Sequence, residues 1–135
     1  MLLAAIIGGL LGAAVFVFAR WQRYDRESAF YPTVLIIIAS YYVLFAVIAA
    51  DRFALVVQLA IAVAFVALAI VGRNLDGRIV AVGIVLHGLY DLAFHWFGGG
   101  GGVPIWWPAF CGTIDLVLGL AVLAATDWLK QARPK

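Results

Sequence analysis

The sequence predicts an all-α membrane protein, a bundle of five transmembrane helices, because it is very apolar, its apolar spans have helical length and it lacks strand-like alternation. Of its 135 residues, 67% are hydrophobic and only 12% are charged. One small core in water cannot bury that much apolar surface. Backbone groups in lipid must pair within a helix or a closed barrel, and a barrel needs alternating polar and apolar residues. We therefore expect one helical transmembrane domain over residues 1–135.

Five apolar spans of sufficient length follow one another along the chain. At 1.5 Å per residue, about 18 to 22 residues make about 27 to 33 Å of helix, which matches a hydrocarbon core of about 30 Å. The spans are expected at residues 2–19, 29–50, 53–72, 79–97 and 108–125. Polar breaks at 20–28, 51–52 and 73–78 separate the first four, and a glycine run with two tryptophans precedes the fifth. In the first span, Ala4, Gly8 and Gly12 recur every four residues and predict a close helix contact.

The distribution of basic residues predicts how the bundle lies in the membrane. With five spans, Arg52 stands alone on one side, and the other basic residues share the opposite side: Arg20, Arg23, Arg26, Arg73, Arg78, Lys130, Arg133 and Lys135. Cytoplasmic loops carry the excess of Lys and Arg. We therefore expect the C-terminus in the cytoplasm, the N-terminus outside, and the chain in the plasma membrane. No basic segment precedes the first span, so we expect it to be retained and not removed as a signal peptide.

Charge and cysteine content exclude some classes of protein. The formal net charge of +2 is too small to indicate a nucleic-acid partner. The single cysteine, Cys111, excludes an internal disulfide and a metal site built from several cysteines.

Most polar residues of the spans fall in the half expected to face outward. Tyr42, Gln58, Asp91 and Asp115 all lie there, while the cytoplasmic half of the spans has almost nothing polar. A through-going pore would need polar lining at both ends. The asymmetry instead predicts a cavity that opens outward or toward the outer leaflet.

A stripe of ionisable residues marks the candidate site. His87, Asp91 and His95 are four residues apart on the fourth span, and Cys111 and Asp115 form a similar stripe on the fifth. Each ionisable group inside hydrocarbon costs about 2.5 to 3.5 kcal/mol even on the lenient insertion scale, so such a cluster indicates function. We expect the two stripes to face each other.

The chemistry predicted for this cluster centres on an imidazole and two carboxylates. Asp91, one turn from His87, is placed to accept a hydrogen bond from the imidazole, an arrangement found in general bases and behind metal ligands. We therefore predict His87, Asp91 and Asp115 as catalytic residues, with Asp115 as second carboxylate. The same three residues are candidate ligands of a single zinc-like ion. His95 lies about 12 Å from His87 along the helix axis, too far for both to bind one ion easily. A proton relay, or a hydrogen-bonded network that only joins the helices, stays open.

Further residues are candidates for ligand binding. They are aromatic or reactive side chains in or near the half of the bundle that is expected to face outward: His95, Tyr42, Trp106, Trp107 and Cys111. The tryptophans also fit an interfacial aromatic belt, and a lone buried cysteine is more often a small packing residue. The glycine run at 98–102 is interpreted as a flexible link that acts either as a lid or only as a connection.

The C-terminal third of the chain contains a run of motifs: His87-x3-Asp91-x3-His95, then Pro-Ile-Trp at 104–106, a proline at 108 and Cys111-x3-Asp115. This pattern resembles that of a family of small bacterial and fungal integral membrane proteins whose function has not been assigned. In the family pattern an aromatic residue precedes the aspartate, and two adjacent histidines follow it before a short Gly-Asn-Pro-Ile-Trp link. This chain has phenylalanine at position 94, in place of the first histidine, and five glycines in the link. The resemblance implies a shared site around the His and Asp residues.

Two classes of function remain open from the sequence. The first, which we favour, is an enzyme or binding protein for a lipid-like or isoprenoid substrate that enters from the outer leaflet. The second is a non-catalytic membrane subunit or transporter protomer whose cluster carries protons or ions. The expected partners are the lipid bilayer, a lipid-like ligand and, for either class, further copies of the chain or a larger membrane complex. A transporter usually has broken helices or repeated halves, and neither is visible here.

Overall fold

The structure is a computed structural model that describes residues 1–94, 96 and 100–131, with side chains described up to residue 125. Within these residues the chain is all-helical and contains five long helices and one short 3-10 helix. They are α1 (Leu2–Trp21), η1 (Tyr24–Arg26), α2 (Phe30–Ile48), α3 (Arg52–Leu75), α4 (Gly77–Phe94) and α5 (Trp107–Gln131). All five long helices are long and apolar enough to cross a membrane. The predicted helical class and the number of spans are therefore confirmed.

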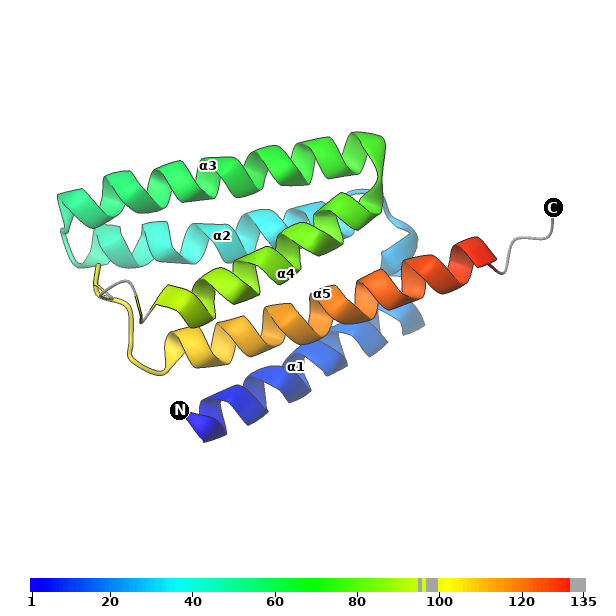
Figure 1. Cartoon of the computed structure of the whole chain (residues 1–135), viewed down its shortest axis with the longest axis horizontal. Coiled ribbons are helices and arrows are strands. Elements are labelled where there is room, and N and C mark those ends of the chain that lie inside the picture. Colours follow the sequence, from blue (N-terminus) through cyan, green and yellow to red (C-terminus); the bar gives the residue numbers. More distant parts are fainter. Residues whose placement is uncertain (95, 97–99, 132–135) are drawn as a thin grey trace.

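Successive helices run in opposite directions, so the connections gather at the two ends of the bundle (Figure 1). One end holds the N-terminus, the α2–α3 turn and the link between α4 and α5, and we call it the link end. The other end holds the α1–α2 connection, the α3–α4 turn and the end of α5. This alternation agrees with the predicted five-span arrangement, while its orientation in the membrane stays a prediction.

Helix α5 lies between α1 and α4, and α4 in turn packs against α2 and α3 (Figure 1). The buried apolar core joins α2, α3 and α4, and its largest members are Leu35, Ile38, Phe65 and Ile84. A second, smaller core around Leu118 joins α4 and α5. Helices α4 and α5 therefore occupy the middle of the bundle and have the largest share of buried residues among the five helices.

Small residues let α1 approach α5 closely, as the sequence predicted. A methyl group added at Gly8 would overlap the carbonyl oxygen of Phe110 and the hydroxyl of Thr113. One added at Gly12 would lie 2.6 Å from the carbonyl oxygen of Ile114. The Thr113 hydroxyl donates to a backbone carbonyl of α1, at 2.9 Å, across this contact. The predicted packing role of the Gly8 and Gly12 face is confirmed.

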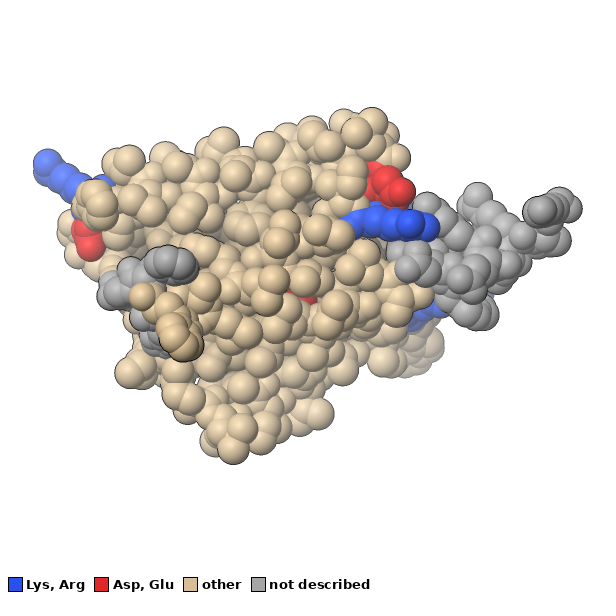
Figure 2. Space-filling view, viewed as in Figure 1, with Lys and Arg blue, Asp and Glu red and all other residues tan. Residues whose placement is uncertain are grey.

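The surface along the helices is apolar, and the charges gather at the ends. Figure 2 shows Lys and Arg at the two ends of the bundle and an almost uncharged surface between them. Large apolar side chains such as Leu10, Val56 and Leu120 are more than half exposed there. A surface of this kind suits contact with lipid tails.

The helix boundaries differ from prediction mainly at the α3–α4 turn. The polar segment 73–78 was expected to be non-helical, but α3 continues to Leu75, α4 begins at Gly77, and Asp76 alone separates them. The Asp76 backbone is extended, and its carboxylate accepts a hydrogen bond from the Arg78 amide at 2.9 Å. One capping residue is enough to end one helix and start the next, because polar side chains at a membrane surface do not disfavour helix. Helix α4 is described as far as Phe94, and the expected end of the fourth span at residue 97 lies outside the described residues.

Candidate functional site

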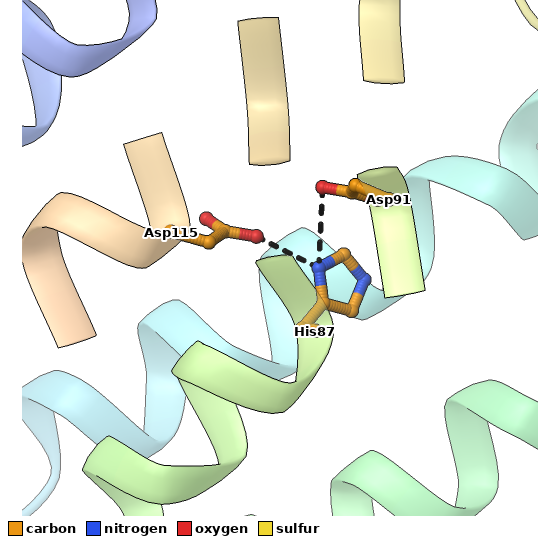
Figure 3. A group of neighbouring side chains, drawn as sticks. All are labelled: His87, Asp91 and Asp115. Carbon is orange, nitrogen blue, oxygen red and sulfur yellow. Dashed lines mark hydrogen bonds and ion pairs between the residues drawn. The ribbon is translucent and has the colours of Figure 1, made fainter. Parts of the chain in front are cut away.

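His87, Asp91 and Asp115 meet in the middle of the bundle (Figure 3). The His87 Nδ1 atom lies 2.8 Å from the Oδ2 of Asp115 and 3.6 Å from the Oδ2 of Asp91. Their exposed fractions are 1% for the histidine and 0% for both aspartates. The two stripes therefore face each other as predicted, and the three predicted catalytic side chains form one buried cluster, which we call the His–Asp centre.

Two glycines bring the aspartates together across the α4–α5 contact. A methyl group added at Gly88 would lie 2.8 Å from the Gly112 carbonyl oxygen and 3.0 Å from the Cβ of Asp115. One added at Gly112 would lie 3.1 Å from the Cβ of Asp91. Each glycine therefore leaves room for the carboxylate of the opposite helix. Neither glycine was predicted as a site residue, although each lies three residues before an aspartate in the sequence.

The hydrogen bond of His87 runs between helices and not along α4 as expected. The predicted bond to Asp91, one turn further along, is 3.6 Å long, beyond the range of a good hydrogen bond. The bond to Asp115 at 2.8 Å has the length typical of a charge-assisted contact. The close glycine contact brings the α5 carboxylate nearer to the imidazole than the α4 carboxylate, which explains the difference.

Most of the carboxylate oxygens in the centre have no hydrogen-bond partner. Among the described residues, both oxygens of Asp91 and the Oδ1 of Asp115 are buried without one. The Tyr42 hydroxyl and the Cys111 thiol are close enough to Asp91 to interact with its charge. Neither makes a hydrogen bond of good geometry to it, and the Tyr42 hydroxyl itself lacks a partner. Buried oxygens in this state cost about 1 to 3 kcal/mol each, so the centre is set up to accept a proton or a cation.

An aromatic shell surrounds the imidazole. The ring of Phe65 meets the His87 ring edge-on at 5.0 Å, and the rings of Tyr42 and Tyr90 lie 6.2 and 6.0 Å away. Phe94 closes the shell against Tyr42 at 4.7 Å. These rings exclude water and strengthen electrostatic interactions inside the centre.

A cavity of about 320 Å³ opens at the link end, between α3 and α4. Its walls come from α3, α4, the α2–α3 turn and the link: Asp51, Phe53, Ala54, Val57, Gln58, Ile61, Tyr90, Phe94, Gly100 and Gly101. The Tyr90 hydroxyl donates to the Gln58 side-chain oxygen at 2.7 Å on this wall. The predicted cavity is thus present at the end expected to face outward, but none of the three residues of the His–Asp centre lines it. Tyr90 stands between them, because its ring contacts both the cavity and His87.

The predicted ligand-binding residues fall into three groups. Tyr42 and Cys111 are buried and lie beside the centre, at 2% and 4% exposure. Trp107 packs edge-on against Phe45, at 5.0 Å, while Trp106 is 47% exposed. Neither tryptophan has a ring contact with His87 among the described residues, so the structure does not bring them to the centre. His95 lies outside the described residues.

Gln58 and Tyr90 are two polar residues of the cavity wall that were not predicted as site residues. Both were visible in the sequence as polar groups in the expected outer half, and their hydrogen bond across α3 and α4 is what sets them in one wall. A buried glutamine in an apolar helix was the available signal.

The chemistry open to the centre is that of one imidazole and two carboxylates in a dry interior. Such a set can hold and move a proton or ligate a metal ion. Helices α4 and α5 alone carry the three side chains of the centre.

The chain was compared with protein-family models, with curated proteins and with solved structures, and no match was found.

Proposed function

We propose that this chain is an integral membrane protein that binds a lipid-like molecule, such as an isoprenoid, in the cavity between α3 and α4. In this proposal the His–Asp centre serves as the acid/base group next to the bound molecule. The observation that carries the proposal is Tyr90, which lines the cavity on one side and contacts the His87 ring on the other.

The cavity has the size and lining that a lipid-like ligand needs. Small-molecule pockets measure about 300 to 1,000 Å³ and are mostly apolar, with a few polar groups that fix orientation. This cavity measures about 320 Å³. Phe53, Val57 and Ile61 suit an alkyl or isoprenoid chain, and Gln58 with Tyr90 suits one polar head. Because the cavity lies beside lipid-exposed helices, a ligand would enter it from the bilayer.

The orientation of the imidazole supports an acid/base role. Asp115 holds Nδ1, and the second ring nitrogen points away from both carboxylates (Figure 3). A carboxylate that holds one imidazole nitrogen fixes the tautomer and leaves the other nitrogen for proton transfer. Tyr90 lies on the route between this ring and the cavity, where a phenol is suited to pass a proton or to position the ligand.

A second function stays open because the centre is enclosed. Since His87, Asp91 and Asp115 are almost fully buried, the centre also suits a non-catalytic subunit or transporter protomer that carries a proton or ion. A purely structural network is the third alternative. Residence in the plasma membrane and assembly with further copies or other subunits belong to the proposal in each case.

The test compares two neighbouring valines of α3. Val57 lines the cavity and is 38% exposed, whereas Val56 does not line it and is 69% exposed. Binding of a fluorescent farnesyl alcohol to the purified protein in nanodiscs would be measured by titration. We expect Val57→Phe to narrow the cavity and weaken binding at least about tenfold, equivalent to about 1.4 kcal/mol. Val56→Phe adds the same bulk outside the cavity and should bind as the wild type does.

Equal affinities for the two variants and the wild type would contradict binding in this cavity. So would the absence of saturable binding to the wild type. Thermal unfolding of both variants serves as the control for folding. Both should unfold close to the wild-type temperature, because each substitution lies at a lipid-facing or partly exposed position.

A further inference from the structure

The two carboxylates of the His–Asp centre, when ionised, need a compensating positive charge, which either protons or a bound cation would supply. Two ionised carboxylates carry two negative charges, and a neutral imidazole carries none. Among the buried side chains of the described residues, His87 is the only group that can become cationic, because none of them is Lys or Arg. Burying uncompensated charge in a low-dielectric interior is strongly unfavourable. One divalent cation would make the sum zero.

The unpaired oxygens indicate where such a cation would bind. Asp91 is fully buried, and neither of its oxygens has a hydrogen-bond partner. Figure 3 shows its carboxylate turned toward the imidazole, with Asp115 on the other side of the same ring nitrogen. Buried oxygens that no donor satisfies are rare in folded proteins and call for an explanation such as an ion.

The spacing of the ligand atoms fits one ion after small side-chain rotations. One atom from each of His87, Asp91 and Asp115 lies within 4.8 Å of the others. Ligand atoms bound at about 2.0 to 2.2 Å in tetrahedral geometry stand about 3.4 Å apart. The two distances from His87 Nδ1, 2.8 and 3.6 Å, bracket that value. All three residues come from two adjacent helices, α4 and α5.

From these observations we infer that His87, Asp91 and Asp115 form a binding site for one divalent transition-metal ion with zinc-like ligand preference. An imidazole together with carboxylates selects such an ion over magnesium, which prefers oxygen ligands alone. Three protein ligands leave one position open, as in catalytic zinc sites. This inference uses the same centre as the proposed function, but it does not require that a lipid binds nearby.

The competing explanation is a closed hydrogen-bonded network without metal. Tyr42 and Cys111 stand beside Asp91 and would satisfy its oxygens if both side chains rotated slightly. In that case the centre would hold protons and no ion. The two explanations differ in metal content, which can be measured directly.

The experiment measures zinc in the full-length protein purified in detergent without a polyhistidine tag. The protein is incubated with zinc, passed through a desalting column and assayed by mass spectrometry for metal per chain. We expect about one zinc per chain in the wild type. Retention in His87→Gln, Asp91→Asn and Asp115→Asn should fall at least about tenfold, since even outer-shell partners change metal affinity 10- to 100-fold.

Asp25→Asn is the matched control for loss of a carboxylate. Asp25 pairs with Arg20 at 3.2 Å, far from the centre in the η1 helix, so this variant should retain zinc as the wild type does. If a centre variant fails to fold, X-ray absorption of the zinc-loaded wild type replaces it, and we expect nitrogen and oxygen ligands that include one imidazole.

The inference would be overturned if the wild-type protein held no stoichiometric zinc after loading. It would also be overturned if all three centre variants retained as much zinc as the wild type does. A metal shell without imidazole would do the same. Failure here is distinguishable from failure of the proposed function, because Val57→Phe narrows the cavity and changes none of the three metal ligands. A protein that binds the farnesyl alcohol but no zinc would retain the function and lose only the metal.

Discussion

The two aspartates of the centre should contribute unequally to stability, although they look alike by sequence. Both are fully buried, so Asp91→Ala and Asp115→Ala remove the same atoms from equally enclosed positions. The cost of the cavity left behind should therefore be similar. Only Asp115 accepts the 2.8 Å hydrogen bond from His87, whereas Asp91 accepts none. The difference between the two variants isolates this bond.

The expected difference in the free energy of unfolding comes from the buried imidazole N–H of His87, which loses its acceptor in Asp115→Ala. That costs about 1 to 3 kcal/mol in proteins. Side-chain hydrogen bonds inside membrane proteins contribute less, about 0.6 kcal/mol on average and up to about 1.7 kcal/mol. We therefore expect Asp115→Ala to lower the free energy of unfolding by about 1 to 2 kcal/mol more than Asp91→Ala does.

Unfolding by sodium dodecyl sulfate in mixed micelles, followed by tryptophan fluorescence, measures this difference in protein treated with a chelator. Metal removal matters because a bound ion would make both aspartates ligands and hide the asymmetry. Adding His87→Ala to each variant should abolish the difference, since the donor is then gone. Equal losses for the two single variants, or a larger loss for Asp91→Ala, would refute the assignment of the hydrogen bond.

Two other predictions concern packing and topology. Gly8→Ala should lower the free energy of unfolding by about 1 to 3 kcal/mol in the same assay, because the added methyl group overlaps α5. Gly9→Ala is the control, since its methyl group meets only a side chain at 3.8 Å and should be tolerated. Similar losses for both variants would contradict the close α1–α5 contact. Reporter fusions should place Lys135 and the 73–78 segment in the cytoplasm and Gly100 outside, and a cytoplasmic Gly100 would reverse the orientation of the cavity.

Much of the helical architecture was predictable because it depends on local composition and length. Apolar spans of membrane-spanning length predicted all five helices. Spacing by four residues placed His87 and Asp91 on one face of the fourth helix, and Cys111 and Asp115 on one face of the fifth. The small residues of the first span indicated a close contact before its partner was known. The breaks were misjudged, as at Asp76, where a single capping residue suffices. The end of the last helix was misjudged too, because α5 continues to Gln131, beyond the expected end at residue 125.

The arrangement inside the site depends on contacts between helices, which a single sequence does not encode in a readable way. Helical periodicity shows that His87 and Asp91 share a face, but it cannot tell that Asp115 lies nearer to the imidazole. That outcome follows from Gly88 and Gly112, whose missing side chains set the distance between α4 and α5. The cavity likewise depends on how α3 packs against α4 at Tyr90. The sequence therefore indicated at which end of the bundle the cavity lies, but not which residues line it.

The nuclear magnetic resonance signals of the His87 ring test most directly whether the cavity and the His–Asp centre act as one site. The chain has two histidines, so a His95→Asn variant leaves His87 as the only source of imidazole nitrogen signals. With the protein in nanodiscs, we predict that farnesyl alcohol shifts these signals saturably when His95→Asn is the only substitution. When Val57→Phe is added and narrows the cavity, the shift should need at least about ten times more alcohol. Binding of the alcohol that saturates without any change in the His87 ring nitrogens would contradict the account.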